Sequence, residues 1–170
     1  MKTLAGIMPL LLLGGAAPAQ QKPNIVFILT DDLGWKDLGC YGNKFAETPN
    51  IDSLAKRGIL FTQAYAACPV SSPTRASIIT GRYPARLQLT NFIAGNRTDA
   101  SSPVLPAPWK PYLESREITI AELLRGSGYS TGMAGKWHLG SYDSIAPWNQ
   151  GFDYSRMIGK NGLDYYNYSI

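Results

Sequence analysis

One apolar run, N-I-V-F-I-L-T at residues 24–30, limits the possible folds of this chain more than any other feature. The run is continuous rather than alternating and is rich in β-branched residues, which is typical of a strand buried on both faces of a parallel sheet. It ends at Asp31-Asp32-Leu33-Gly34, which predicts a loop at the carboxyl end of that strand. A strand of this kind requires helices that cover the sheet.

The rest of the chain alternates between helix and strand patterns. Helices are predicted at 48–57, 72–81 and 118–125, and further strands at 59–64 and 130–134. Residues 91–111 are rich in Pro, Ser and Asn and predict a long surface loop, and the tail from 149 to 170 is irregular. This order predicts an α/β fold with a mostly parallel sheet flanked by helices.

The polar residues that follow the predicted strands define a candidate site. Asp31, Asp32, Lys136 and His138 come directly after strands, and Ser71 lies just before the start of a helix. Ligands of open parallel sheets bind beyond the carboxyl ends of the strands. We therefore expect these five residues at one edge of the sheet.

The N-terminus predicts export. Lys2 precedes an apolar run, and Ala17-Pro18-Ala19 provides a small-residue cleavage site, so residues 1–19 are expected to form a signal peptide. The apolar run is too short to span a membrane, so we expect a secreted or periplasmic protein with no membrane span. Residues 20–170 suffice for one domain. The net charge of +4 comes without a basic run, which gives no indication of nucleic-acid binding.

The two cysteines, Cys40 and Cys68, leave two possibilities open. Export permits a disulfide between them, and two buried free thiols fit equally well. Their spacing does not match that of a zinc site.

Asp31 and Asp32 are the candidate metal ligands. Adjacent carboxylates repel each other unless a positive charge lies between them, and a divalent cation with oxygen ligands meets that need. The alternative is that one caps a turn while the other is solvated, which is the more frequent outcome for a bare Asp-Asp pair.

The segment from Ser71 to Gly81 is the candidate catalytic segment. Ser71 and Ser72 could simply cap the helix, with Pro73 at its first position. Alternatively, the free N–H groups of the helix start could bind a sulfate or phosphate oxygen. Arg75 lies four residues after Ser71 and can turn back toward that anion, for which its planar guanidinium is suited.

Several motifs together resemble the type I sulfatases, which are related to alkaline phosphatase. The family signature is Cys or Ser, any residue, Pro, any residue, Arg, then four residues and Thr-Gly, and it fits at Ser71, Pro73, Arg75, Thr80 and Gly81. Similar segments flank it at 25–35, 48–55, 81–87, 128–140 and 151–154. Counting from Cys68 instead would place neither Pro nor Arg where the signature requires them, so Ser71 is the position that matches.

The resemblance implies a sulfuric ester hydrolase in which Ser71 is oxidised to formylglycine by a maturation enzyme. One hydroxyl of the hydrated aldehyde attacks sulfur, and the other lets the enzyme expel sulfate. It further implies calcium bound by Asp31, Asp32 and the modified side chain of Ser71. Arg75 and Lys136 would contact the modified residue or sulfate oxygens, and His138 would assist proton transfer. A sulfated polysaccharide is the expected substrate.

Type I sulfatases are typically longer than this chain, and further metal ligands come later in their sequences. We therefore expect the fold to be incomplete at the C-terminus and these residues alone to be inactive. Two alternatives stay open, a phosphodiesterase or phosphonate hydrolase of the same superfamily and a catalytically dead module that binds sulfated glycans. A deliberate Cys-to-Ser replacement at position 71 would give the same sequence.

Overall fold

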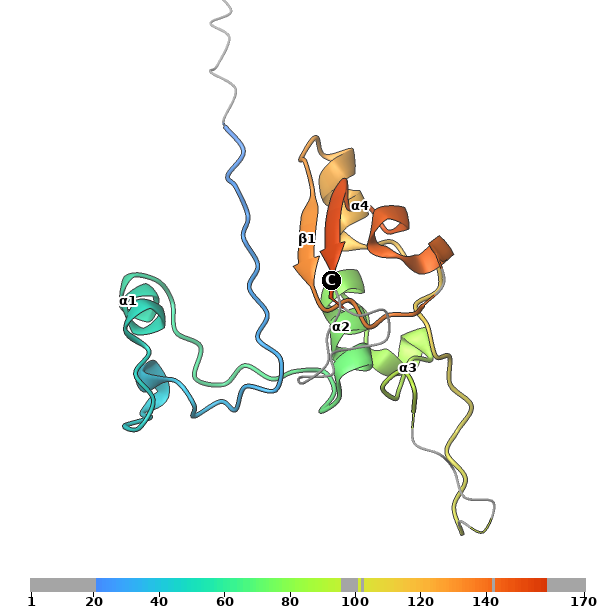
Figure 1. The fold of residues 1–170 in the computed structure, drawn as a ribbon, viewed down its shortest axis with the longest axis horizontal. Coiled ribbons are helices and arrows are strands. Elements are labelled where there is room, and N and C mark those ends of the chain that lie inside the picture. Colours follow the sequence, from blue (N-terminus) through green and yellow to red (C-terminus); the bar gives the residue numbers. More distant parts are fainter. Residues whose placement is uncertain (1–20, 96–100, 102, 142, 159–170) are drawn as a thin grey trace, which may run out of the picture. The chain divides into compact units, whose positions relative to one another are not determined.

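A computed structural model describes residues 21–95, 101, 103–141 and 143–158 (Figure 1). The predicted signal peptide lies outside the described residues, as does the chain after residue 158. The chain divides into two units, residues 1–33 and 34–170, and each is described by itself. Among the described residues, no helix is both long and apolar enough to cross a membrane.

Every helix and strand of the described residues lies in the second unit. Its helices are α1 (Pro49–Arg57), α2 (Ser71–Thr80), α3 (Pro84–Leu87) and α4 (Ile120–Gly126), with short 3-10 turns η1 (Gly39–Tyr41), η2 (Asp143–Ile145) and η3 (Pro147–Asn149). Helices predicted at 48–57, 72–81 and 118–125 are thus confirmed, with ends shifted by one or two residues.

Local chemistry explains where these helices begin and end. Thr119 accepts a hydrogen bond from the Glu122 N–H, and Glu122 accepts one from the Thr119 N–H, so the two form a capping box at the start of α4. Gly81 ends α2 with φ 67°, a left-handed conformation that glycine adopts without steric cost.

The sheet has two parallel strands in the described part of the chain. β1 (Gly132–Gly135) pairs with β2 (Tyr154–Met157), with Gly132 opposite Tyr154 and Gly135 opposite Met157 (Figure 1). The parallel pairing and the intervening turns confirm the α/β class. The prediction of an irregular tail was wrong for Tyr154–Met157, because this short segment gains its strand conformation from pairing with β1 and not from a strong local pattern.

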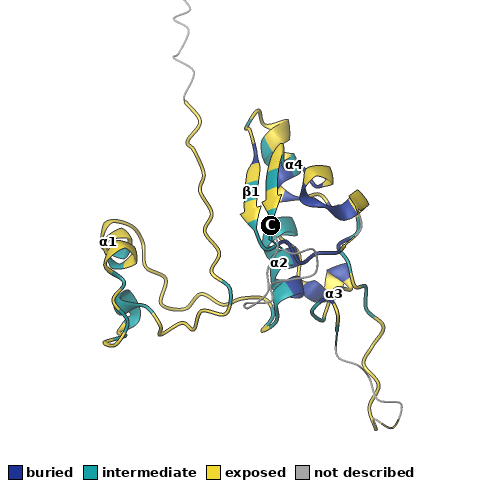
Figure 2. Ribbon diagram, viewed as in Figure 1, coloured by how far each residue is buried: buried dark blue, intermediate teal, exposed yellow. Residues whose placement is uncertain are grey.

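The hydrophobic core lies between α2, α3 and the segment after β1. Its buried members are Ala76, Leu87, Leu89, Leu113, Trp137 and Leu139. Trp137 is fixed there by its indole N–H, which donates to the Ile145 carbonyl at 2.9 Å, and by an edge-on contact with Phe152. Figure 2 shows this buried zone around α2 and α3, in contrast to the exposed N-terminal stretch.

Two predicted strands are absent. Residues 24–30 and 59–64 are described without strand structure, and Val26, Ile28 and Ile59 are about four-fifths exposed. An extended segment becomes a strand only when its N–H and C=O groups pair with a neighbour, and the described sheet pairs only β1 with β2. The predicted 91–111 loop is largely exposed where described, but Ile93 at its start is buried.

Candidate active site

The start of α2 forms the centre of the candidate site. Ser71 is the first residue of the helix, and Val70 occupies the N-cap without a side-chain hydrogen bond. Neither Ser71 nor Ser72 is therefore the capping residue, and Pro73 is the third helical residue rather than the first. The capping interpretation was wrong, because the Ser71 hydroxyl contacts the side chains of Arg75 and His138, and the Ser72 hydroxyl accepts from the Ile93 N–H.

The Ser71 hydroxyl lies between two basic side chains. Arg75 Nε donates to Ser71 Oγ at 3.0 Å, and His138 Nδ1 lies 3.1 Å from the same oxygen. Arg75 reaches back because residues four apart share one face of a helix. Its Nη1 also donates to the Lys136 carbonyl at 2.6 Å, so the planar guanidinium links the helix start to the segment after β1.

His138 is held by the residues on either side of it. Trp137 and Leu139 are almost fully buried in the core. His138 itself is buried and has φ 56°, a left-handed conformation that is uncommon for non-glycine residues and in which His is overrepresented. Core packing on both sides therefore fixes a backbone conformation that turns the imidazole toward Ser71.

The contacts of His138 define which ring nitrogen carries the hydrogen in the neutral imidazole. Its Nε2 lies 3.0 Å from the Ile93 carbonyl oxygen, which can only accept, so Nε2 carries a hydrogen. In the neutral imidazole Nδ1 is then an acceptor, and Ser71 donates its hydroxyl hydrogen to it. Ser71 Oγ at the same time accepts from Arg75. The three side chains thus form one consistent donor–acceptor chain.

The structure brings together Ser71, Arg75 and His138, with Lys136 present through its backbone carbonyl. Their catalytic roles remain predictions. Sequence reasoning missed Ile93, which contacts His138 through its main chain. A backbone contact leaves no residue-type signal, so no motif could have indicated it.

Asp31 and Asp32 belong to the first unit, so their position relative to Ser71 is not defined. Asp31 is half-buried, and Asp32 is exposed with φ 54°, a conformation that Asp tolerates. Within the described residues no group of three or more His, Cys, Asp or Glu side chains is arranged to hold a metal ion. The adjacent carboxylates supply hard oxygen ligands of the kind that calcium prefers, so their chemistry fits that ion.

Both cysteines are free thiols and half-buried, which decides between the two possibilities that the sequence left open. The Cys68 carbonyl accepts a hydrogen bond from Thr74 Oγ1 at 2.6 Å, which ties the segment before α2 to its first turn. Cys68 thus lies outside the helix, whereas Ser71 opens it.

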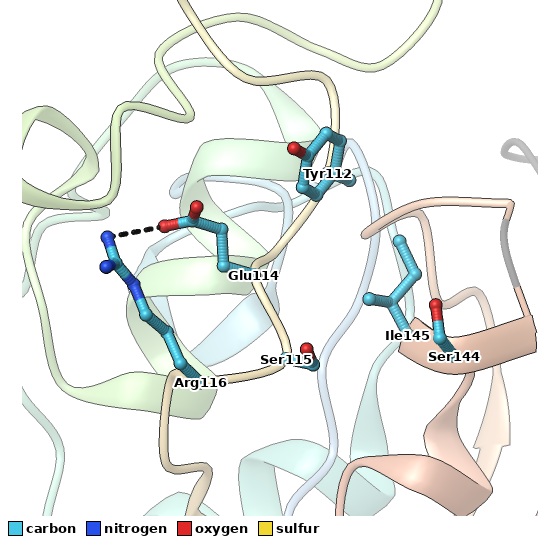
Figure 3. A pocket seen from close by; sticks show the side chains of 6 residues that line it. All are labelled: Tyr112, Glu114, Ser115, Arg116, Ser144 and Ile145. Atoms are coloured by element: carbon cyan, nitrogen blue, oxygen red, sulfur yellow. Dashed lines mark ion pairs between the residues drawn. The ribbon is translucent and has the colours of Figure 1, made fainter.

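A separate cavity of about 410 Å³ is lined by Tyr112, Glu114, Ser115, Arg116, Ser144 and Ile145 (Figure 3). Glu114 pairs with Arg116 at 2.8 Å and with Lys110 at 2.9 Å. The hydrogen bond from Lys110 and the charge of Arg116 keep the pKa of Glu114 below its ordinary value. No predicted site residue lines this cavity, so it is separate from the candidate site at Ser71.

Comparison with known proteins identifies the family. The sulfatase family model matches residues 23–169, so this α/β chain belongs to the sulfatase family. N-acetylgalactosamine-6-sulfatase of Canis lupus familiaris is 43% identical over 139 residues, which make up 82% of this chain and 26% of that protein. Steryl-sulfatase of Homo sapiens is 47% identical over 127 residues, covering 72% of this chain and 20% of that protein.

A solved structure agrees with this assignment. The chain matches the crystal structure of Ps i-CgsB in complex with k-i-k-neocarrahexaose with a TM-score of 0.66 and 41% identity, over 79% of this chain and 28% of that one. These matches confirm the sulfatase-like fold. The chain spans about a quarter of the length of the relatives that it matches.

Proposed function

We propose that residues 20–170 belong to the catalytic domain of a sulfatase that hydrolyses sulfate esters, with Ser71 as the precursor of its nucleophile. The observation that carries the proposal is the position of Ser71 Oγ at the start of α2, within 3.1 Å of both Arg75 Nε and His138 Nδ1. The activity belongs to the full-length enzyme, by which we mean the polypeptide carrying this chain together with the rest of a sulfatase-length sequence.

Sulfatases generally use a formylglycine and a divalent cation, and we propose that Ser71 is the residue oxidised here. A hydrated formylglycine supplies two hydroxyls on one carbon, one to attack sulfur and one whose deprotonation releases sulfate. An unmodified serine would remain sulfated after a single attack. Oxidation of the serine requires a maturation enzyme as a transient partner of the chain.

The residues around Ser71 take defined roles in this proposal. Arg75 holds the side chain at position 71 and compensates negative charge near it. His138 accepts or returns a proton at Nδ1, because its Nε2 hydrogen is committed to the Ile93 carbonyl. Lys136 follows β1 and supplies a cation for the sulfate oxygens.

Asp31 and Asp32 are proposed to hold calcium together with the modified side chain of Ser71. Their carboxylates are the hard oxygen ligands that this ion takes, and it would supply positive charge for the sulfate oxygens. Calcium takes six to eight oxygen ligands, so water, sulfate oxygens or further residues would complete the site beside the two carboxylates and the side chain at position 71.

For the substrate, we propose a sulfate ester on a glycan. The name N-acetylgalactosamine-6-sulfatase and the neocarrahexaose complex both concern sugars, whereas the name steryl-sulfatase shows that relatives of similar identity differ in substrate. A phosphoester hydrolase is not favoured, because the curated relatives compared above are sulfatases. Export by the signal peptide at residues 1–19, to the periplasm or the exterior, suits an extracellular glycan.

Mass spectrometry tests the central claim. The full-length enzyme is produced in a host with a serine-type maturation enzyme, and the tryptic peptide 58–75 is sequenced. We expect a species lighter by two hydrogen atoms, with the change located at Ser71 and not at Ser72. Sulfate release from an aryl sulfate with added calcium is measured in parallel, with Ser71→Ala as the control. An unchanged peptide without sulfate release would overturn the proposal.

A further inference from the structure

Ser72 is completely buried directly beside the proposed nucleophile precursor. Its hydroxyl does not cap α2 and instead accepts a hydrogen bond from the Ile93 N–H at 2.9 Å. Ser72 and Ile93 are 21 residues apart, so this bond fixes the start of the 91–111 loop against the first turn of the helix. The Ser72 hydroxyl therefore holds the backbone of Ile93 in place.

The same residue, Ile93, presents its carbonyl to His138. The carbonyl oxygen lies 3.0 Å from Nε2, and Ile93 is itself buried. The backbone of Ile93 therefore bridges Ser72 on one side and His138 on the other. Directly after it, Ala94 and Gly95 adopt positive φ values of 89° and 57°, so the backbone turns immediately after Ile93.

We propose that Ser72 is a positioning residue for His138. By holding the Ile93 main chain, it keeps the carbonyl on Nε2, which fixes the neutral tautomer whose Nδ1 faces the side chain at position 71. This step rests on the proposed function of Ser71 and His138. Ser72 acts through Ile93 and touches neither His138 nor the reacting atoms in this scheme.

A positioning role for Ser72 and a purely structural role predict different effects of its replacement. A serine that merely fills space contributes to stability and leaves the histidine unaffected. A positioning serine controls the order of the imidazole, because an unrestrained ring loses the geometry required for proton transfer. Loss of the hydrogen-bond partner of a metal-binding histidine lowers activity by roughly 10- to 100-fold, and we expect an effect of the same order here.

The test compares Ser72→Ala with Ser77→Ala in the full-length enzyme. Ser77 lies on the same helix, is half-buried, and donates its hydroxyl hydrogen to the Thr74 carbonyl, so its replacement also removes one side-chain hydrogen bond. Ser72→Thr retains the hydroxyl acceptor and serves as the rescue variant. Each protein is labelled with ¹⁵N-histidine and its ring N–H protons are observed by NMR. The signal that is missing in His138→Gln is assigned to the Nε2–H proton of His138.

We expect the wild-type enzyme to show an Nε2–H proton in slow exchange with water. In Ser72→Ala this proton exchanges at least about tenfold faster, and kcat falls roughly 10- to 100-fold with KM little changed. Ser77→Ala matches the wild type in both measurements, and Ser72→Thr restores the protected proton.

Two results would overturn the inference. One is a protected Nε2–H proton and an unchanged kcat in Ser72→Ala. The other is the absence of a protected Nε2–H proton in the wild type, which decides the matter even if Ser72→Ala does not fold. Failure of the proposed function gives a different result from failure of this inference. The Nε2–H proton would then be protected in the wild type, but the enzyme would hydrolyse no sulfate ester.

Discussion

Two apolar stretches of this chain differ in solvent exposure. Residues 25–29 are all apolar, yet each is between 42% and 82% exposed, and no strand forms there. The segment after β1 contains Trp137 and Leu139, which are 1% and 0% exposed. The second segment leads out of a strand paired with β2, whereas the described residues give the first no partner. Hydrophobicity alone therefore does not bury a stretch of chain, because the backbone must also find hydrogen-bond partners.

The difference extends to the candidate site. Side chains in the packed region have defined contacts, as Ser71, Arg75 and His138 show. Asp31 and Asp32 follow the exposed stretch and are not placed relative to them. Ser71, Arg75 and His138 thus belong to a packed region, whereas Asp31 and Asp32 follow a stretch whose apolar residues 25–29 are exposed.

The largest effect is expected when a buried tryptophan is compared with an exposed one. Trp137→Ala removes a fully buried indole, its hydrogen bond to the Ile145 carbonyl and its contact with Phe152. We expect the free energy of unfolding to fall by about 3–5 kcal/mol. Trp35→Ala changes a side chain that is 68% exposed and should cost within about 0.5 kcal/mol. Urea denaturation followed by circular dichroism measures both, and equal losses would contradict the comparison.

The next effect concerns the geometry of Arg75. Arg75→Lys keeps the positive charge but loses the planar group that bonds Ser71 Oγ and the Lys136 carbonyl at once. We expect kcat/KM for an aryl sulfate to fall about 100-fold or more in the full-length enzyme. Arg86→Lys, on the exposed face of α3, is the matched control and should leave the rate unchanged. A similar rate for both variants would mean that charge alone suffices at position 75.

The sequence predicted the helices better than the strands, for a physical reason. A helix makes its hydrogen bonds within itself, and its ends are marked by Pro49, Gly58, the Thr119 capping box and Gly81. A strand depends on a neighbour distant in the sequence. Residues 24–30 have a strong strand pattern but pair with no other described segment, whereas Tyr154–Met157 has a weak pattern and pairs with β1.

The same reasoning applies to the site. The spacing of Ser71 and Arg75 within one helix allowed their contact to be anticipated, because the helical repeat fixes it. The contact of His138 with Ser71 spans 67 residues and depended on matched motifs. Ile93 acts through its backbone, and Ser72 acts on that backbone, so neither contact could be inferred from residue types.

A smaller effect is expected in the exposed apolar stretch. Ile28→Asp replaces a side chain that is 79% exposed, so the free energy of unfolding of the 170-residue chain should change by no more than about 0.5 kcal/mol. Self-association should decrease, because the variant interrupts a run of exposed apolar residues. Sedimentation velocity over a range of concentrations measures this, with Thr30→Asp as a control that adds charge without removing an apolar side chain. A destabilisation above about 1 kcal/mol would show that residues 25–29 are packed in solution.

The smallest effect is a pH dependence within the packed region, at Asp153 beside β2. The Thr131 N–H donates to its carboxylate at 2.9 Å, and the Thr131 hydroxyl lies 3.0 Å from the same oxygen. These hydrogen bonds favour the ionised form, so the pKa of Asp153 in the folded protein is below its ordinary value. The stabilisation is then complete above the unfolded-state pKa of about 3.9 and is lost as the pH falls through the lower folded-state pKa.

Asp153→Asn removes the titrating group while retaining an acceptor oxygen for Thr131. The difference in free energy of unfolding between wild type and variant should therefore be largest near pH 6 and shrink as the pH is lowered below 4. Asp143→Asn, at an exposed position on η2, provides the control for the loss of one surface carboxylate. Urea denaturation at a series of pH values gives the comparison. If the difference in free energy of unfolding stayed constant with pH, the charge of Asp153 would not contribute to stability. If the difference grew in acid, the direction of the Asp153 pKa shift would be contradicted.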